Sequence, residues 1–274
     1  MLQPEQCIED LHHTRLKRTI VLALDKFVGR WCRRSSRVTF LPGDLCIKSG
    51  HAVRLTEALT MEYVRKHTTI PVPKVFCAFE HHGAVYIAME RLAGQPLGWE
   101  WARRSDDSKA YILQQLRDYV VQLRDLPRMS DCNSVAAIDG GPFLDERLPG
   151  SSSPVGPFPS VKQFHRYLRS DQETDLKHNE DVQHLVKMHD ETSENVCFTH
   201  NDLSSFNILV DGQQITGIID WEYAAWLPSY WEYTSAWHVS PQNMFWRDEV
   251  GKFLDVYEKQ LEMEKIRRQW FGDY

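Results

Sequence analysis

Residues 197–222 read CFTHNDLSSFNILVDGQQITGIIDWE, and this stretch decides the fold. Two apolar runs rich in β-branched residues, FNILV at 206–210 and ITGII at 215–219, are separated by Asp211-Gly212. An Asp-Gly pair between two such runs is a strong signal for a β-hairpin. The stretch therefore predicts two antiparallel strands joined by a tight turn.

Polar side chains stand at the ends of these two predicted strands. His200 and Asp202 precede the hairpin, Asn207 begins its first strand, and Asp220 ends its second strand. Loops and strand ends beside a hairpin can meet at one edge, so we expect Asp202, Asn207 and Asp220 on one side of a cleft. Two carboxylates and an amide form an all-oxygen ligand set, which suits Mg²⁺ better than zinc.

The first ninety residues predict a small antiparallel α+β lobe. RVTFL at 37–41 and DLCIK at 44–48 are strand-like runs around Pro42-Gly43, and KVFCAFE at 74–80 and AVYIAME at 84–90 are strand-like runs around His82-Gly83. Both patterns are typical of hairpins. Between them, 54–67 has helical spacing and is followed by IPVP, which stops a helix. The order strand, strand, helix, strand, strand is typical of a small antiparallel α+β domain.

A further helix is predicted over 14–33, before the first strand. Apolar residues recur at helical spacing along it: Leu16, Ile20, Leu24, Phe27 and Trp31. We expect this side of the helix to pack on the small lobe.

The chain after residue 91 is predicted to be mostly helical, at 108–126, over 161–190 and in the last fifty residues. We therefore expect two domains, 1–91 and 92–274. The stretch 133–160 is rich in Gly, Pro and Ser and is long for a connector. It fits a lid or binding loop and a solvated insertion equally well.

Composition narrows the class of protein. The chain has 274 residues and a net charge of −6, which argues against nucleic acid as the main partner because that partner calls for a basic surface. Its six cysteines are scattered singly, which indicates free thiols, and no apolar run reaches the roughly 20 residues of a membrane span. We expect a cytoplasmic protein without a membrane or nucleic-acid partner.

The pattern H-x-D-x-x-x-x-N at 200–207, followed by I-D-W-E at 219–222, resembles the aminoglycoside phosphotransferases. Choline kinases share this pattern, and protein kinases have the same layout in the motifs H-R-D-x-x-x-x-N and D-F-G. The resemblance continues upstream in CIK at 46–48, EALTMEYVRK at 57–66, TTIPVPKV at 68–75 and AMERLAG at 88–94. The sequence looks most like the form of this family found in filamentous fungi.

This resemblance implies a protein-kinase-like bilobal α+β fold, with a small antiparallel-sheet lobe and a mostly helical one. It also implies a kinase that moves the γ-phosphate of ATP to a hydroxyl of a small molecule. Asp202 would accept the proton of that hydroxyl, and Asn207 and Asp220 would hold Mg²⁺. His200 would brace the catalytic loop. Glu222 could be a second carboxylate beside the metal or a charge at a strand end, and we favour structural support.

The nucleotide residues follow from the same resemblance. Lys48 would contact the α- and β-phosphates, with Glu57 as its acidic partner and Glu62 as the competing choice. The linker that begins with Met89, Glu90 and Arg91 would hydrogen-bond the adenine through its backbone.

Two departures keep alternatives open. No G-x-G-x-x-G precedes Lys48, and the candidate turn is 41–44 (LPGD); this favours a catalytically inactive, kinase-like binding module as the alternative function. Asn201 stands where aminoglycoside enzymes usually have Gly, which resembles choline kinases and widens the choice of substrate. A protein kinase is disfavoured because nothing after Asp220 resembles an activation segment ending in A-P-E.

Simpler structural roles compete at individual positions. Asp202 could be a turn residue, Lys48 a surface lysine on an edge strand, and Glu57 part of a solvated helix face. The seven Trp and Tyr residues of 221–237 could bind an amine, but core packing is the better interpretation.

Overall fold

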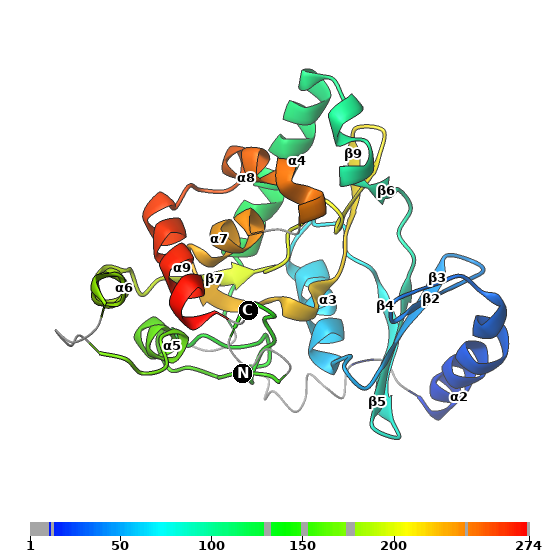
Figure 1. The fold of residues 1–274 in the computed structure, drawn as a ribbon. Coiled ribbons are helices and arrows are strands. Elements are labelled where there is room, and N and C mark those ends of the chain that lie inside the picture. Colours follow the sequence, from blue (N-terminus) through cyan, green and yellow to red (C-terminus); the bar gives the residue numbers. More distant parts are fainter. Residues whose placement is uncertain are drawn as a thin grey trace. The chain divides into compact units, whose positions relative to one another are not determined.

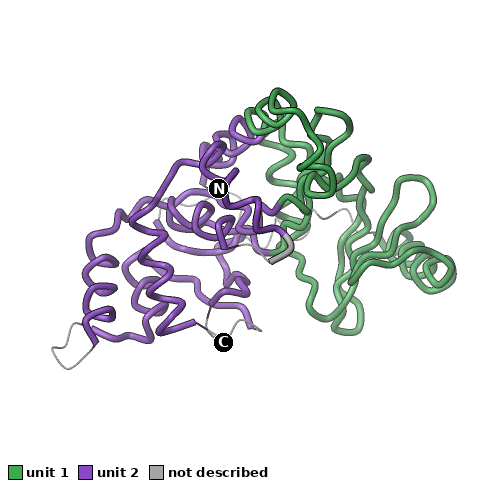
Figure 2. Tube along the Cα trace, turned by 45° about the horizontal axis from the view of Figure 1, so that its top comes forward, with its two compact units in different colours: residues 1–115, 205–222 green, residues 116–204, 223–274 purple. Residues whose placement is uncertain are grey.

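The computed structural model describes residues 11, 14–128, 133–148, 153–173, 179–238 and 241–272. By their internal contacts the residues fall into two compact units (Figure 2). Unit 1 comprises Met1–Gln115 and Ser205–Glu222, and unit 2 comprises Leu116–Ser204 and Tyr223–Tyr274. The decisive stretch 197–222 therefore contributes residues to both units.

Unit 1 contains a five-stranded antiparallel sheet in the order β1-β2-β3-β5-β4. Both predicted hairpins are confirmed, β2 with β3 and β4 with β5, and a short strand β1 extends the edge. In the turn between β4 and β5, His82 and Gly83 have φ angles of 50° and 75°, which is typical of a tight hairpin turn. The strands are β1 (Arg34–Ser35), β2 (Val38–Leu41), β3 (Leu45–Gly50), β4 (Val75–His81) and β5 (Ala84–Glu90).

Helices α2 (Arg15–Ala23) and α3 (Leu55–His67) cover opposite faces of this sheet (Figure 1). Val21 of α2 shares a core cluster with Ile47 of β3 and Phe79 of β4. The next residue of β3, Lys48, points to the other face, where it pairs with Glu57 of α3. Successive side chains of a strand alternate between faces, so β3 contacts α2 on one face of the sheet and α3 on the other.

The predicted first helix forms, but the side of it that packs was predicted wrongly. After α2 the chain continues as a π turn, Leu24–Val28, and a 3-10 turn, Gly29–Trp31. The residues in contact with the sheet core are Val21, Leu22, Leu24 and Val28. Four of the five residues expected to pack are largely exposed: Leu16 at 71%, Ile20 at 48%, Phe27 at 56% and Trp31 at 84%. The segment carries two apolar stripes, and helical spacing alone could not rank them.

A second, three-stranded sheet of unit 1 has the order β6-β8-β9. Strands β8 (Ile208–Asp211) and β9 (Gln214–Ile218) form the hairpin predicted from Asp211-Gly212, and β6 (Gln95–Pro96) pairs with β8. Two 3-10 turns, Leu97–Trp99 and Trp101–Arg103, follow β6.

Unit 2 is mainly helical, as the sequence predicts. A two-stranded ladder of β7 (Val196–Thr199) and β10 (Ala225–Pro228) lies among its helices. The core contains Phe164, Leu185, Trp231 and Met263, which places part of the Trp- and Tyr-rich segment in the core as interpreted. The helices are α4 (Asp106–Arg124, beginning in unit 1), α5 (Val161–Leu168), α6 (Glu180–Glu191), α7 (Trp231–Trp237), α8 (Arg247–Phe253) and α9 (Glu258–Phe271), with a 3-10 segment at Pro241–Trp246.

Part of the Gly-, Pro- and Ser-rich stretch 133–160 is packed into unit 2. Isolated antiparallel bridges join Val135 to Phe158 and Phe143 to Val155. Val135, Phe143 and Leu148 are buried and belong to the core of the unit. The solvated-insertion interpretation is therefore wrong for these residues; 149–152 lie outside the described residues.

The chain is thus α+β, with an antiparallel sheet in its N-terminal part and helices in its C-terminal part, as expected. Among the described residues, no helix has both the length and the hydropathy needed to cross a membrane.

Candidate active site

Lys48 is the centre of a buried charged cluster in unit 1. It lies within β3, paired with Val38 on one side and Ile87 on the other, and its residue is only 5% exposed. Its Nζ lies 2.9 Å from Glu57 Oε1 and 2.7 Å from Asp220 Oδ1. The interpretation of Lys48 as an ordinary surface lysine is wrong, because its charge is buried among carboxylates.

The acidic partner on α3 is Glu57, and Glu62 has another role. Glu57 is 2% exposed, whereas Glu62 Oε1 accepts a hydrogen bond from the Val75 amide at 3.3 Å. Burial raises the pKa of Glu57 to about 7, although the nearby Lys48 opposes this shift. Burial opposes the charge of Lys48 too, but the surrounding carboxylates outweigh it, so the pKa of Lys48 is raised.

Asp220 and Asn207 stand at the same end of the β8–β9 hairpin. The Ile219 amide donates to the Asn207 carbonyl at 2.9 Å, so Asn207 lies opposite Ile219, next to Asp220. Asp220 has a φ of 66°, a left-handed conformation that Asp tolerates better than most residues. Asp220 follows the end of β9 at Ile218, and its side chain reaches Lys48. Within unit 1 the structure therefore brings Lys48, Glu57 and Asp220 into contact and places Asn207 beside Asp220.

A third carboxylate, Glu222, also reaches Lys48. Its Oε2 lies 3.1 Å from Lys48 Nζ, and its Oε1 accepts from Arg37 at 2.9 Å. Arg37 was missed in the sequence, where only its place in a strand-like run was noted. It stands in the short turn between β1 and β2, at the end of β2 that pairs with Lys48.

The position of Arg37 shows which turn of the sheet lies beside Lys48, and it is not the turn considered as a phosphate loop from the sequence. The turn proposed from the sequence, 41–44, joins β2 to β3 at the opposite end from Lys48, because Leu45 rather than Lys48 pairs with Leu41 there. The turn adjacent to Lys48 is that of Ser36 and Arg37, and Ser36 has a φ of 50°. It is far too short for a glycine-rich loop.

The three linker residues expected to bind adenine lie at the end of β5. Met89 is buried and Glu90 is the last residue of the strand. The Glu90 amide donates to the Lys74 carbonyl at 2.9 Å, and the Arg91 amide donates to the Asp44 carbonyl at 2.8 Å. These two N–H groups are thus used within unit 1, and the Glu90 carbonyl accepts from the Cys46 thiol at 3.7 Å.

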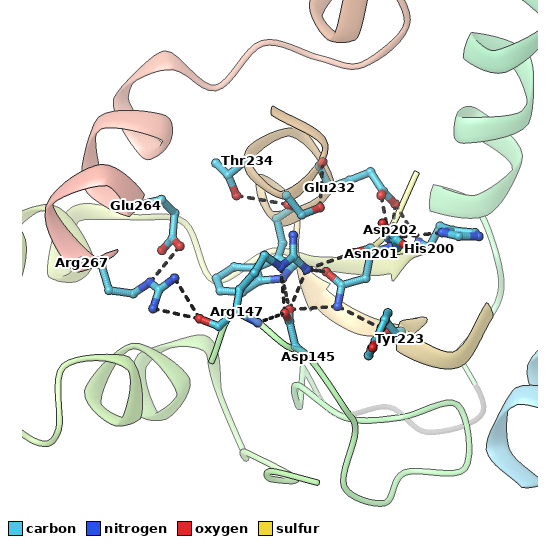
Figure 3. Close-up of polar contacts among 12 residues, drawn as sticks. Asp145, Arg147, His200, Asn201, Asp202, Tyr223, Glu232, Thr234, Glu264 and Arg267 are labelled. Atoms are coloured by element: carbon cyan, nitrogen blue, oxygen red, sulfur yellow. Dashed lines mark hydrogen bonds and ion pairs between the residues drawn. The ribbon is translucent and has the colours of Figure 1, made fainter. Parts of the chain in front are cut away.

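Asp202 belongs to unit 2, in a loop held by side chains from other elements (Figure 3). The Asp202 amide donates to His200 Nδ1 at 3.2 Å. Glu232 of α7 accepts from the amides of His200 at 2.7 Å and Asn201 at 3.1 Å. Burial raises the pKa of Glu232 to about 7, opposed first by the His200 amide and then by Arg124.

Asp145 and Arg147 also contact this loop, and sequence reasoning missed both. Arg147 donates to Asp145 through Nε at 2.8 Å and through its terminal nitrogen at 2.7 Å, and also to the Asn201 carbonyl at 3.0 Å (Figure 3). Burial lowers the pKa of Arg147, but Asp145, Asp202 and Glu232 outweigh it, so the net shift is upward. The only sequence signal was a D-x-R within the Gly- and Pro-rich stretch, which is too common to single out.

Comparison with known proteins assigns the family. The profile of the phosphotransferase enzyme family matches residues 51–269, so this chain belongs to that family. No curated protein sequence matches it.

Solved structures of aminoglycoside phosphotransferases share the fold. The enzyme APH(4)-Ia is 15% identical with a TM-score of 0.59, covering 84% of this chain and 78% of that chain. A thermostable variant of APH(4)-Ia, solved with ADP and hygromycin B, is 14% identical with a TM-score of 0.61, covering 89% of this chain and 88% of that chain. Spectinomycin phosphotransferase APH(9)-Ia, solved with ADP and spectinomycin, is 11% identical with a TM-score of 0.53, covering 84% and 74%.

Proposed function

We propose that this chain is an ATP-dependent kinase that transfers the γ-phosphate of ATP to a hydroxyl of a small molecule. The acceptor would be an amino alcohol, an aminoglycoside, a sugar or a natural product. Family membership supports phosphotransfer, and the related enzymes solved with ADP or AMP-PNP support the nucleotide. The closer likeness to the fungal form of the family, a lobe boundary near residue 91 and a cytoplasmic location remain predictions.

The observation that carries this proposal is the pairing of Lys48 with both Glu57 and Asp220. Kinases of this layout need a strand lysine that is paired to a helix glutamate and lies beside the metal-binding aspartate. Lys48 would bind the α- and β-phosphates, and Glu57 would hold its ammonium group in place. The backbone of Met89, Glu90 and Arg91, with the residues that follow, would bind the adenine.

The residues around Asp220 fit Mg²⁺. Among the described residues, no group of three His, Cys, Asp or Glu side chains could hold a metal by itself. Mg²⁺ usually binds one or two protein side chains together with phosphate oxygens and water, so a complete protein cage is not needed. Asp220 and Asn207 would be those side chains, and their oxygens suit this ion. When bound, Mg²⁺ neutralises negative charge on the phosphates.

Asp202 would act as the catalytic base. The acceptor oxygen bonds to the γ-phosphorus while the bond between that phosphorus and the β–γ bridging oxygen breaks, which releases ADP. The proton of the acceptor hydroxyl passes to the Asp202 carboxylate. The Asp202 backbone is held by its contact with His200, and this supports a bracing role for His200.

One observation favours a second candidate, an inactive kinase-like protein that binds nucleotide or another protein. The turn beside Lys48 is short and holds Ser36 and Arg37 in place of a glycine-rich loop. Such a protein would bind Mg·ATP without transferring its phosphate.

Thermal unfolding with and without saturating Mg·ATP, followed by ADP release with a panel of acceptors, tests both candidates. At a nucleotide concentration of about 100 times Kd, binding stabilises the folded protein by about 2.7 kcal/mol. Asp202→Asn should keep this stabilisation and lower kcat by about 10² to 10⁴-fold. Stabilisation without ADP release for any acceptor supports the inactive form, and full turnover by Asp202→Asn rules out the assigned base.

A further inference from the structure

Asp145 and Arg147 form a partly buried ion pair in the stretch 133–160. The Asp145 side chain is 1% exposed. Besides Arg147, the Asp145 carboxylate accepts from the Trp231 indole at 3.0 Å and from the Asn201 side-chain amide at 2.9 Å. Burial raises the pKa of Asp145, but Arg147 and these hydrogen bonds outweigh it and hold the pKa below its usual range. The carboxylate is therefore ionised and fully hydrogen-bonded.

The pair contacts Asn201, the residue directly before Asp202, at its carbonyl and at both polar atoms of its side chain. Arg147 donates to the Asn201 carbonyl at 3.0 Å and also to the side-chain oxygen of Asn201. The Asn201 side-chain nitrogen donates to Asp145 and to the Tyr223 carbonyl at 3.1 Å, and the Asn201 amide donates to Glu232. Figure 3 shows Arg147 and Asp145 on one side of Asn201, with Glu232 on another.

Asn201 adopts a left-handed conformation, with a φ of 70°. Asn adopts this conformation more readily than most residues, and residues held in it cluster at functional sites. The peptide between Asn201 and Asp202 carries the carbonyl that Arg147 binds. The direction in which the Asp202 side chain leaves the loop thus depends on this peptide.

Stability alone explains the pair poorly. A buried ion pair is often no more stabilising than well-packed apolar residues of the same volume, because both charges lose their hydration. The pair fixes the geometry of Asn201, because Arg147 donates to its two oxygens and Asp145 accepts from its side-chain nitrogen.

We propose that Arg147, held by Asp145, is a positioning residue for phosphoryl transfer. It fixes the Asn201–Asp202 peptide so that the Asp202 carboxylate is oriented toward the acceptor hydroxyl. The catalytic part of this inference rests on the proposed function. Asp145 and Arg147, from the stretch 133–160, would then brace the catalytic loop.

The test compares Arg147→Gln with Arg169→Gln, which also removes an arginine paired with a carboxylate. Arg169 is 1% exposed and binds the Gln172 carbonyl and Glu173, away from the catalytic loop. Hydrogen exchange is measured at the amides of 200–202, all of which donate to Glu232 or His200. Nucleotide affinity and kcat are measured with Mg·ATP and the best acceptor of the panel.

Arg147→Gln should expose the amides of 200–202 to exchange and lower kcat about 10²-fold with an unchanged Kd for Mg·ATP. Arg169→Gln should lower the melting temperature while leaving exchange at 200–202 and kcat as in the parent. If Arg147→Gln does not fold, Asn201→Gly replaces it, since Gly accepts the φ of 70° and lacks the side-chain contacts. That variant should change both quantities in the same direction, by less.

Unchanged exchange at 200–202 overturns the proposal, and so does lost protection with an unchanged kcat. If the parent protein transfers phosphate to no acceptor, the proposed function fails instead. The exchange data then still decide whether Arg147 holds the loop.

Discussion

Lys48 is one buried cation shared by three carboxylates, those of Glu57, Asp220 and Glu222. Arg37 adds a second cation through Glu222 only. The described side chains here thus carry more negative than positive charge when all are ionised. Glu57 responds with a pKa raised to about 7, mainly because it is buried. Under the proposed function, a bound Mg²⁺ would offset this excess negative charge.

Removing the cation should be costly. We expect Lys48→Met to lower the free energy of unfolding by about 3 kcal/mol, because it leaves buried carboxylates without their partner. The control is Lys252→Met, which removes an exposed lysine paired with Glu249 and should change stability by less than about 0.5 kcal/mol. Urea unfolding of both variants measures the difference. Equal stabilities would show that the Lys48 cluster contributes nothing to the fold.

Individual site residues could be predicted where they belong to a sequence motif. Residues that meet only in the folded protein could not. Lys48 and Glu57 were chosen from the resemblance to the family, and the structure pairs them. Arg37 and Arg147 lie 185 and 54 residues from their partners Glu222 and Asn201. No local pattern signals contacts of this kind, since they depend on how distant turns approach one another.

At the scale of elements, the β8–β9 hairpin is the scaffold that carries Asn207 and Asp220, and Gly94 is packed against it. Gly94 has a φ of 108°, and a Cβ there would lie 2.4 Å from Thr216 Oγ1 and 2.9 Å from the Val210 carbonyl oxygen. The backbone of the linker therefore approaches the hairpin more closely than any side chain allows. This approach lets β6 pair with β8.

Gly94→Ala should lower the free energy of unfolding by about 2 to 3 kcal/mol, from the strained φ and the clash with a backbone oxygen. Gly212→Ala is the matched control, because it also has a positive φ of 58° but meets no atom within 4 Å. It should cost about 1 kcal/mol. Denaturant titration of both variants measures their free energies of unfolding. If Gly94→Ala loses no more stability than Gly212→Ala, the close approach of the backbone at Gly94 is contradicted.

Elements were predicted better than the faces they bury. Both N-terminal hairpins, α3 and the β8–β9 hairpin follow from turn chemistry and periodicity, which are local. The buried side of α2 did not follow, because Leu16 and Val21 belong to two apolar stripes of one segment. Only the shape of the sheet beneath selects between them.

At the scale of the whole molecule, acid stability should depend on a histidine in the core of unit 2. His165 is 1% exposed, its Nε2 lies 2.9 Å from the Tyr230 hydroxyl, and its Nδ1 lies 3.2 Å from the His189 carbonyl. Burial lowers its pKa to about 4, helped by the charge of Arg169 and opposed by the His189 carbonyl. Between pH 6.5 and 4, therefore, the unfolded chain binds a proton at this residue and the folded protein does not.

Stability should therefore be unaffected by this residue above pH 6.5 and should fall as the pH drops toward 4, by about 3 kcal/mol in total. His165→Phe removes the titrating group. The difference in unfolding free energy between parent and variant should then change by this amount between pH 7 and pH 4. Parallel pH profiles would show that His165 is protonated as readily in the folded state as in the unfolded one.

The class of the whole molecule was predictable because its motifs lie in the order and spacing of one family, whose profile covers residues 51–269. The contacts of Asp145 and Arg147 with Asn201 were not predictable. Their stretch has the composition of a loop, yet Val135 and Phe143 bury it in the core. Composition describes solvent preference on average and gives no information about such long-range packing.

Titration calorimetry of Mg·ATP with the parent protein, Asp220→Asn and Asp202→Asn tests whether the protein binds Mg·ATP through Asp220 and independently of Asp202. Both substitutions keep the shape of the side chain and remove its charge. The parent should bind Mg·ATP, Asp220→Asn should bind it at least about tenfold more weakly, a loss of about 1.4 kcal/mol, and Asp202→Asn should bind it as the parent does. Equal affinity of the parent and Asp220→Asn, or no binding by the parent, would contradict the account.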